Sequence, residues 1–543
     1  MDSLAIKGGV PLRGEVTISG AKNAVLPIMA ATLLTAEPCV IRRVPDLSDV
    51  VFMGQILVSL GAKVKSDRDT LTVQAAKIKG VGDYELIRKM RGSICILGPL
   101  IGRLRRASVS LPGGCVIGPR PIDLHLKGLS QLGAQITIEG GYIRARAPRL
   151  AGGDVFLGGR AGPTVLGTAN VMMAAALAGG VTTIESAACE PEVVDLANFL
   201  SAMGARIVGA GSPTITITGV KELHGAEHEV IPDRIEAATF AIAAAATNGE
   251  ITLLDVRPDH MHAVLDKLRE SGVKVERRSS TLTVKRGGRL KAVDITTLPY
   301  AGFPTDVQAQ MMVLTTLASG ISIITERIFE SRFMHVSELA RLGAEIAIEG
   351  PSAIVKGGRP LSGAPVMASD LRASAALVLA GLVAKGTTLV KRIYHLDRGY
   401  ERIRGIMRQL IGLLLIIGAI WGCKELYKYW DTVKARKQAE DRGGAPPPTA
   451  AATPTALPGL PSNLESTLLA AQKQGAAGLK NWLKLYRAYV SDPRLAAIEL
   501  DYVVLISSSN PQEARQLFAA VKQRTPANSP VYPRIKQLEK TYQ

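Results

Sequence analysis

A cysteine and an arginine stand five residues apart in the stretch LPGGCVIGPRPIDLH, which covers residues 111–125. Glycines on both sides of Cys115 allow backbone torsions that a Cβ would block, and prolines on both sides of Arg120 stiffen the chain. A thiol held beside a guanidinium favours the thiolate and attracts anions. A lone cysteine is more often a small buried hydrophobe, but this polar, glycine-rich setting favours a reactive residue.

The pattern PGGCxIGxRPIDLH resembles the catalytic loop of the UDP-N-acetylglucosamine 1-carboxyvinyltransferase family of enolpyruvyl transferases. The resemblance is collinear from about residue 1 to residue 410. It implies an enzyme that moves the enolpyruvyl group of phosphoenolpyruvate onto the 3′-hydroxyl of UDP-N-acetylglucosamine and releases phosphate. This cytoplasmic reaction begins peptidoglycan synthesis and needs no cofactor. Further matching blocks follow in order: GEVTISGAKNAVLP (14–27), FPTDVQAQ (303–310), FESRFMH (329–335), SDLRASAALVLAG (369–381) and HLDRGYERI (395–403).

The resemblance assigns catalytic roles to four residues. It makes Cys115 the proton donor to C-3 of phosphoenolpyruvate and a residue that can form a covalent adduct with this substrate. It makes Asp306 the base for the 3′-hydroxyl, and it makes Lys22 and Arg398 cations that hold the anionic substrate. These residue types fit the chemistry, because guanidinium and ammonium groups bind phosphate and a carboxylate can accept a proton. An aspartate after Pro-Thr is also a common helix N-cap, so Asp306 has a structural alternative.

A larger set of residues is implied to bind the two substrates. Within it, Arg91 and Arg372 fit a structural salt bridge as well as they fit substrate contact. The neighbouring His125 and His395 are interpreted as structural. The implied substrate-binding residues are Lys22, Asn23, Arg91, Arg120, Pro121, Ile122, Asp123, Leu124, Asp306, Ile328, Arg332, Asp370 and Arg372.

Residues 158–165, GGRAGPTV, depart from the family pattern. Family members often have a lysine and a Ser-Val-Gly at this point, and these contact the diphosphate. Arg160 and Thr164 are the candidates to replace them.

The elements that position these residues form an internal repeat over residues 1–400. Each copy has a helix that ends in a small-residue turn and is followed by two alternating strands. Glycine supplies the left-handed turn after the helix, and the period of two marks half-buried strands. The copies are LGAKVKSDRDTLTV (60–73), LGAQITIEGGYIRA (132–145), MGARIVGAGSPTITI (203–217), SGVKVERRSSTLTV (271–284) and LGAEIAIEGPSAIV (342–355).

A second set of helices is apolar on nearly all sides, which predicts interior helices wrapped by sheet. Five complete units and a sixth that starts near residue 365 indicate six units in all. The resemblance implies the same α/β fold, an inside-out α/β barrel of two lobes with the active site between them. One lobe covers 22–230 and the other combines 1–21 with 231–410. The apolar helices are expected at 24–34, 164–178, 235–247, 307–319 and 371–384.

The sixth unit is incomplete, because the chain departs from the family pattern after residue 410. The closing strand is missing, replaced or supplied from elsewhere. In its place, residues 409–424 form an apolar run that predicts a transmembrane helix, although a spanning helix usually needs about 20 residues. The alternative is a buried or interfacial helix. This prediction places the catalytic part in the cytoplasm, anchored to the inner membrane, with the C-terminal tail outside.

Two segments follow the apolar run. Residues 443–461 are rich in Pro, Ala and Thr, which indicates a linker. Residues 464–543 show helical periodicity with Asp-Pro and Asn-Pro breaks, which predicts a small all-α tail with an unknown protein partner. The segment 510–539 weakly resembles one helical hairpin of the tetratricopeptide type, and a plain helical bundle is at least as good an interpretation.

Composition excludes several function classes. The net charge is +18, but the Lys and Arg residues are dispersed and aromatic residues make up only 4%, so nucleic-acid binding is not expected. The five cysteines are scattered without metal-ligand spacing, which indicates a reducing compartment and no metal site. No signal peptide opens the sequence.

Three competing interpretations remain open at this point. The first is an inactive, membrane-tethered homologue that acts as a scaffold or regulator, because the sixth unit is unfinished. The second is the sister enolpyruvylshikimate phosphate synthase, which ranks lower because it lacks the GGC loop. The third is a chimeric reading frame joined near residue 410.

Overall fold

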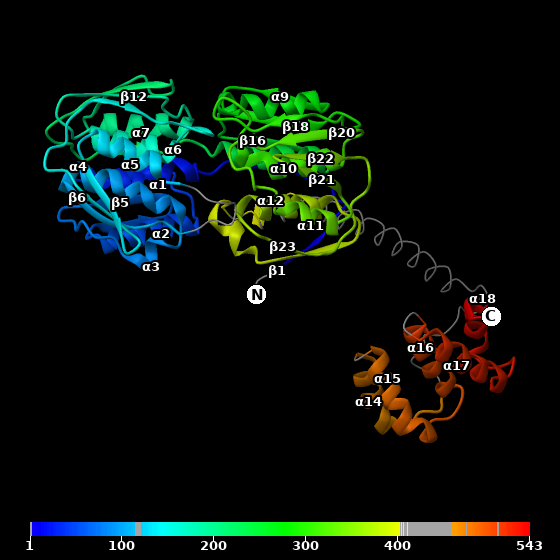
Figure 1. Ribbon diagram of the computed structural model, residues 1–543. Coiled ribbons are helices and arrows are strands. Elements are labelled where there is room, and N and C mark those ends of the chain that lie inside the picture. The colour runs from blue at the N-terminus through cyan, green and yellow to red at the C-terminus, as the bar shows by residue number, and fades with distance from the viewer. Residues whose placement is uncertain are drawn as a thin grey trace, which may run out of the picture. The chain divides into compact units, whose positions relative to one another are not determined.

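The computed structural model divides the chain into two compact units, Met1–Glu425 and Leu426–Gln543. Figure 1 shows the first unit as two lobes, one coloured blue to cyan and the other mainly green to yellow. The predicted site residues Cys115 and Arg120 lie outside the described residues, and so does the apolar run 409–424 apart from Leu410. The described residues are 3–113, 121–401, 403, 405, 406, 410, 458–473, 475–507 and 510–542.

The first lobe carries three sheets of three or four strands, in each of which a hairpin pairs with a further strand, and one two-stranded hairpin at 158–163. Its strands are β3 (Pro38–Arg42), β4 (Lys63–Asp67), β5 (Thr70–Gln74), β6 (Arg106–Ser110), β7 (Gln135–Glu139), β8 (Tyr142–Arg146), β9 (Asp154–Phe156), β12 (Val181–Glu185), β13 (Arg206–Val208), β14 (Thr214–Thr218) and β15 (Glu227–Glu229). The sheet orders are β15–β3–β5–β4, β6–β8–β7 and β9–β12–β14–β13. Because β15 pairs in parallel with β3, the last strand of this lobe closes onto its first.

The second lobe repeats this pattern with strands from both ends of the first unit. Its strands are β1 (Ser3–Lys7), β2 (Arg13–Thr17), β16 (Glu250–Leu254), β17 (Val273–Arg277), β18 (Thr281–Arg286), β19 (Ile295–Thr296), β20 (Ile321–Thr325), β21 (Glu345–Glu349), β22 (Ser352–Lys356), β23 (Pro365–Met367) and β24 (Thr387–Lys391). The sheet orders are β2–β16–β18–β17, β19–β20–β22–β21 and β23–β24–β1. The N-terminal segment is therefore an integral part of this lobe.

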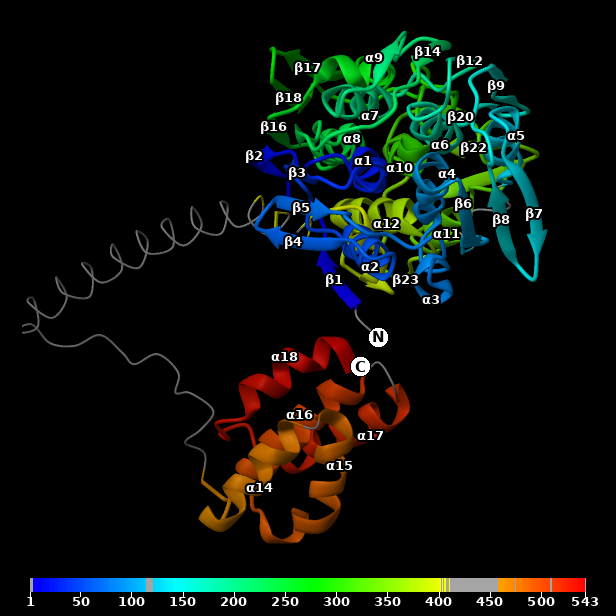
Figure 2. The ribbon, with the colours of Figure 1, turned by 90° about the vertical axis from the view of Figure 1, so that its left-hand side faces the viewer.

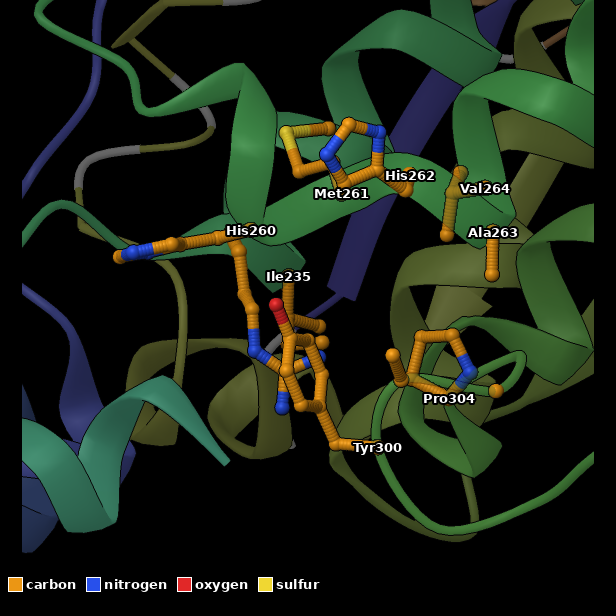
Figure 3. A pocket seen from close by; sticks show the side chains of 11 residues that line it. Ile235, His260, Met261, His262, Ala263, Val264, Tyr300 and Pro304 are labelled. Atoms are coloured by element: carbon orange, nitrogen blue, oxygen red, sulfur yellow. The ribbon is translucent and has the colours of Figure 1, made fainter. Parts of the chain in front are cut away.

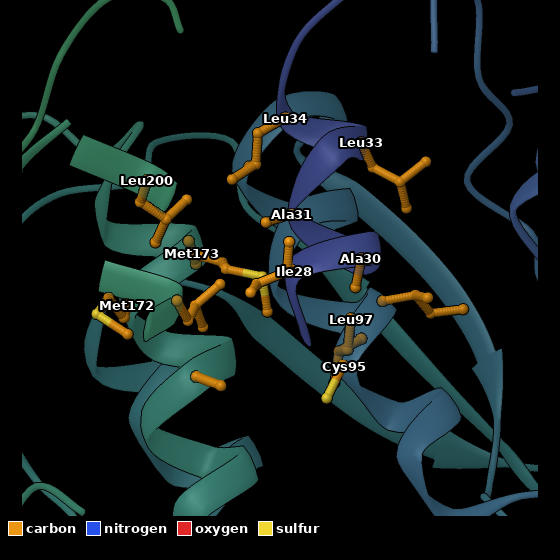
Figure 4. Close-up of a cluster of buried hydrophobic side chains, with 14 of the residues drawn as sticks. Ile28, Ala30, Ala31, Leu33, Leu34, Cys95, Leu97, Met172, Met173 and Leu200 are labelled. Atoms are coloured by element: carbon orange, nitrogen blue, oxygen red, sulfur yellow. The ribbon is translucent and has the colours of Figure 1, made fainter. Parts of the chain in front are cut away.

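Apolar helices fill the interior of both lobes, which confirms the prediction of helices wrapped by sheet. Figure 4 shows one of the two separate cores, with Ile28 and Ala31 beside Met172 and Met173. Small residues allow the helices to touch, since a Cβ on Gly98 would lie 2.3 Å from the Asn170 carbonyl oxygen. The interior helices are α1 (Lys22–Ala31), α4 (Leu97–Leu104), α6 (Val165–Ala175), α8 (Arg234–Ala246), α10 (Gln308–Thr316) and α12 (Leu371–Val383).

A second set of helices ends in the predicted left-handed glycine turns. These are α2 (Ser48–Ser59), α5 (Asp123–Gln131), α7 (Pro191–Ala202), α9 (His262–Glu270) and α11 (His335–Arg341). The turn glycines have positive φ: Gly61 (103°), Gly133 (96°), Gly204 (101°), Gly272 (90°) and Gly343 (91°). Each glycine reverses the chain into the hairpin that follows.

The sixth sheet, β23–β24–β1, differs from the others in its source of strands. Strand β1 pairs antiparallel with β24 along Ser3–Lys7, in the position that the inner hairpin strand takes elsewhere. No further strand pairs with β1 among the described residues. Leu410 is 3% exposed and belongs to the core of this lobe, as do four of the five residues that precede the turn glycines.

In the second unit, the described residues form helices and the turns between them and no strand, as predicted for the tail. Its helices are α14 (Ser462–Lys473), α15 (Gly475–Tyr486), α16 (Arg494–Ile506), α17 (Pro511–Arg524) and α18 (Tyr532–Tyr542), with a 3₁₀ turn at Arg487–Tyr489. Figure 2 shows these helices packed together. They share a core that includes Trp482, Leu500 and Phe518. Across the parts of the chain that the structure describes, none of the helices has the length and apolar character needed to cross a membrane.

Candidate active site

Lys22 is the first residue of α1 and faces a carboxylate from the next helix. Its Nζ lies 2.8 Å from Asp49 Oδ2, and its backbone N–H donates to Asp233 Oδ2 at 3.1 Å. Burial lowers the pKa of Lys22, Asp49 opposes this shift, and Arg372 and Arg398 lower the pKa further. An ammonium at a helix N-terminus with guanidinium groups nearby is a setting that suits an anion.

Asp49 joins Lys22 to Arg398 across the two lobes. Arg398, at the end of the 3₁₀-helix η5 (Ile393–Arg398), places its Nε 2.9 Å from Asp49 Oδ1. Burial by itself would raise the pKa of Asp49, but Lys22 and Arg398 outweigh it and hold this pKa below its ordinary value. Beside this pair, Ser48 Oγ donates to the Asp397 carbonyl oxygen at 3.0 Å. The start of α2 in the first lobe is thus connected to η5 in the second.

Asp306 lies in the second lobe, in the 3₁₀-helix η4 (Thr305–Val307) that precedes α10. Its Oδ1 accepts from Arg332 Nη1 at 2.9 Å and its Oδ2 accepts from Arg372 Nη2 at 3.0 Å. Burial would raise the pKa of Asp306, but the two guanidinium groups hold it well below its ordinary value. The Asp306 side chain caps neither η4 nor α10. The helix-capping alternative is therefore wrong.

Asn23 brings the first lobe to the same carboxylate. Its Nδ2 lies 3.5 Å from Asp306 Oδ2, a long contact between side chains of the two lobes. Together with the Lys22–Asp49–Arg398 cluster, this contact places the predicted cations and the predicted base where the lobes meet.

Two neighbouring segments orient the arginines around Asp306. Asp370 caps α12, since its Oδ1 accepts from the N–H groups of Arg372 (2.9 Å) and Ala373 (3.1 Å). On the Arg332 side, Glu326 is fully buried and accepts from the N–H groups of Ile328 and Phe329. These carboxylates act on backbone groups, so they fix the segments that carry the predicted substrate-binding residues.

Arg372 keeps capacity for a further anion. Its side chain is 3% exposed, and its Nε and Nη1 groups have no hydrogen-bond partner among the described residues. Its guanidinium carbon lies 5.4 Å from the centroid of the Tyr400 ring. Unpartnered buried N–H groups are costly, so the Arg372 side chain is suited to a bound carboxylate or phosphate.

The predicted nucleotide segment, Pro121 to Leu124, lies at the start of α5. Ile122 is buried, whereas Pro121 and Asp123 are exposed. Leu124 lies against the 158–163 hairpin, since a Cβ on Gly159 would be 2.8 Å from Leu124 Cδ1. Leu124 therefore packs the start of α5 against this hairpin, and Pro121 and Asp123 are exposed to solvent.

A buried histidine anchors this segment. His125 Nδ1 lies 2.9 Å from Asn170 Nδ2 of α6. Burial lowers the pKa of His125 to about 4, and Arg91, the first residue of the 3₁₀-helix η2 (Arg91–Ile96), adds to the shift. The neutral imidazole agrees with the structural interpretation of His125.

The two candidates in the departing segment 158–165 have different surroundings. Thr164 caps α6, because its Oγ1 accepts from the Gly167 N–H at 3.2 Å. Arg160 is exposed on the hairpin of β10 (Gly158–Gly159) and β11 (Gly162–Pro163), and its Nη2 lies 2.9 Å from Glu330 Oε1 in the other lobe. The Arg160 side chain is thus exposed, whereas Thr164 caps a helix.

A separate, small pocket lies in the second lobe. Figure 3 shows Ile235, His260 and Tyr300 around it. Its cavity volume is about 10 Å³, which is room for one water at most. Arg234, which also lines it, pairs with Glu192 of the first lobe at 2.9 Å. This pocket is a packing feature beside the lobe boundary.

Sequence reasoning misses two residues of this region, Asp49 and Glu326. Asp49 stands in DLSDVVF and Glu326 in TERIF, and neither motif differs from an ordinary helix start or turn. The one available signal for Asp49 is that it is an acid in the first turn of an otherwise apolar helix. The partners of Asp49, Lys22 and Arg398, come from other parts of the sequence, so only the fold reveals its role.

The sequence profile of the family described as EPSP synthase (3-phosphoshikimate 1-carboxyvinyltransferase) matches residues 6–407. The chain belongs to this enolpyruvyl transferase family. A UDP-N-acetylglucosamine 1-carboxyvinyltransferase of Methylacidiphilum infernorum is 57% identical over 403 residues, which cover 74% of this chain and 96% of that protein. The Desulfosudis oleivorans protein of the same name is 55% identical over 404 residues and has the same coverages.

Solved structures of enolpyruvyl transferases share the fold. The enolpyruvyl transferase NikO of Streptomyces tendae has a TM-score of 0.70 at 26% identity, covering 75% of this chain and 97% of that one. The EPSP synthase of Acinetobacter baumannii has a TM-score of 0.58 at 17% identity, covering 76% and 97%. The α/β enolpyruvyl transferase fold expected from the sequence is therefore confirmed. These structures cover about three quarters of the chain.

Proposed function

We propose that this chain transfers the enolpyruvyl group of phosphoenolpyruvate to the 3′-hydroxyl of UDP-N-acetylglucosamine and releases phosphate. The observation that carries the proposal is the identity above 50% to relatives of that name over nearly their whole length. The groups where the lobes meet support the proposal, because they include cations that can bind an anionic substrate and a carboxylate, Asp306, between two arginines. Nothing in the comparisons favours the inactive scaffold.

We assign the phosphoenolpyruvate anions to the cations where the lobes meet. Lys22 and Arg398 hold the phosphate, supported by the α1 N-terminus. Arg372 offers the carboxylate its Nε and Nη1 nitrogens, which have no hydrogen-bond partner among the described residues, and a guanidinium binds such a group through its planar fork. Arg91 and Arg120 are further proposed ligands of the bound substrates.

Asp306 is the proposed base. It takes the proton of the 3′-hydroxyl while the oxygen attacks C-2 of phosphoenolpyruvate, and Cys115 gives a proton to C-3. Loss of phosphate from C-2 and of a proton from C-3 then restores the double bond. The Asn23 amide, which reaches Asp306 from the other lobe, is placed to donate to the tetrahedral adduct.

The nucleotide is assigned to the two segments beside this cleft. Residues 121–124 are proposed to contact the uridine and sugar, and Ile328 to contact the same part of the substrate from the second lobe. Arg332 and Asp370 complete the proposed binding set. Arg332 acts through the contact with Asp306, and Asp370 acts through the capped start of α12.

The domain assignment is likewise a proposal. The two separate apolar cores support lobes of 22–230 and of 1–21 with 231–410. We keep the transmembrane helix at 409–424, the linker at 443–461 and a partner-binding tail at 464–543 as predictions from sequence. On this basis the catalytic part works in the cytoplasm, anchored to the membrane by 409–424.

Phosphate release by detergent-solubilised full-length protein tests the function. We expect release from phosphoenolpyruvate that depends on UDP-N-acetylglucosamine and disappears in Cys115→Ala. Cys115→Asp can still donate a proton, so it should keep turnover. No release from folded wild-type protein would leave the scaffold or the chimeric reading frame as the better account.

A further inference from the structure

A buried carboxylate that the resemblance leaves without a role connects the two main cations of the cleft. Asp49 is 2% exposed. Its Oδ2 lies 2.8 Å from Lys22 Nζ, and its two oxygens accept from Arg398 Nε at 2.9 Å and Nη2 at 3.4 Å. Lys22 belongs to the first lobe and Arg398 to the second. The Asp49 carboxylate therefore pairs with one cation from each lobe.

We propose that Asp49 is a positioning residue for the reaction, which holds Lys22 and Arg398 together as one binding site for the phosphate of phosphoenolpyruvate. This inference rests on the proposed function, because it assigns both cations to that phosphate. Asp49 acts through its two partners and does not need to contact the substrate.

The local structure favours this role over a simple salt bridge. Asp49 lies in the first turn of α2, where the helix N-terminus stabilises a negative charge. An open cavity of about 400 Å³ lies beside it, lined by residues 46–48 and Val51 of the first lobe and by Asp397, Tyr400 and Ile403 of the second. Beside this cavity, the described residues of the two lobes are joined by the Ser48–Asp397 hydrogen bond and by the charged contact of Asp49 with Arg398.

The charges around Lys22 show what Asp49 supplies. Arg398 on η5 and Arg372 on α12 both lower the pKa of the ammonium, as burial does, and Asp49 opposes them. Asp233 contributes a hydrogen bond to the Lys22 backbone N–H rather than to the ammonium. The other elements packed on α1 include η2 and α7, which carry Arg91, Glu192 and Asp195.

Removal of the Asp49 charge should therefore lower the pKa of Lys22. The pKa of Lys22 falls further, so the ammonium loses its proton at a lower pH than in the wild type. A neutral amine binds phosphate weakly, and the affinity for phosphoenolpyruvate should decline as the pH rises.

The test compares Asp49→Asn with the wild type in the full-length protein, from pH 6 to pH 9. We expect the KM for phosphoenolpyruvate to rise roughly tenfold or more, the scale of a lost charge-assisted contact, and to rise further with pH. The KM for UDP-N-acetylglucosamine should stay within about twofold, because Asp49 acts on the phosphate site.

Asp195→Asn is the matched control. Asp195 is also 2% exposed in the first lobe, and it accepts from His228 Nε2 and the Ile231 N–H at 2.9 and 3.2 Å. This variant should lower the melting temperature and leave both KM values and their pH dependence unchanged. Asp49→Glu keeps the charge, so it should give a flat pH profile even where the KM for phosphoenolpyruvate is raised.

The outcomes separate the two claims. An inactive wild type would overturn the proposed function itself. An active wild type, with Asp49→Asn and Asp195→Asn alike in KM ratio and pH dependence, would overturn the positioning role. If Asp49→Asn does not fold, Asp49→Glu decides the matter, since equal rises of both KM values would overturn it as well.

Discussion

Two carboxylates lie between cations where the lobes meet, and their surroundings differ. The side chain of Asp306 is 26% exposed, and Arg332 and Arg372 belong to its own lobe. The side chain of Asp49 is 3% exposed, and its two cations come from opposite lobes. The comparison teaches that a carboxylate between cations meets a substrate only where its oxygens are accessible. Where they are buried, it acts by holding its neighbours.

The largest expected difference is in catalysis by Asp306. Asp306→Asn should lower kcat by about 10²–10⁴, the usual contribution of a general base, and raise KM far less. Steady-state kinetics with both substrates measure this split. Equal losses in kcat and in affinity would place Asp306 with Asp49 as a residue that only positions others.

Stability should separate Asp49 from ordinary surface acids. Asp49→Ala leaves Lys22 and Arg398, whose side chains are 10% and 29% exposed, without their shared carboxylate. Removing one partner of a buried ion pair costs about 3–5 kcal/mol of unfolding free energy. Denaturant unfolding, monitored by a spectroscopic probe in the first unit, measures this loss of unfolding free energy. A change below about 1 kcal/mol would show that Asp49 is solvated rather than buried between the lobes.

A pH profile sharpens the role of the arginines around Asp306. Arg332→Gln removes one of the groups that depress the pKa of this carboxyl. The pKa should therefore rise, and the ionised base should be lost at a higher pH as the solution is acidified. The acid limb of kcat should move to higher pH than in the wild type. An unchanged limb would contradict the assignment of Asp306 as the base.

The smallest effect is expected where a pair between lobes is exposed. Arg160 and Glu330 are 88% and 61% exposed, so Glu330→Gln should change the unfolding free energy by less than about 1 kcal/mol. Thermal unfolding checks this value. A loss as large as that of Asp49→Ala would mean that burial does not account for the difference between these contacts.

Part of this arrangement is predictable from the sequence. The family motifs contain Lys22, Asp306 and Arg398. The glycine turns indicate the repeat to which these residues belong. Asp49 has no such motif, because its importance comes from Arg398, which is distant in the chain and arrives only with the fold. The role of β1 is hidden for the same reason, since its partner β24 lies near the other end of the first unit.

The most direct test of the central claim is detection of the product on the nucleotide. Full-length protein is incubated with phosphoenolpyruvate and UDP-N-acetylglucosamine, and the nucleotide fraction is analysed by mass spectrometry beside Asp306→Asn. We predict enolpyruvyl-UDP-N-acetylglucosamine from the wild type and almost none from the variant. Unchanged UDP-N-acetylglucosamine in the presence of folded wild-type protein would contradict the account.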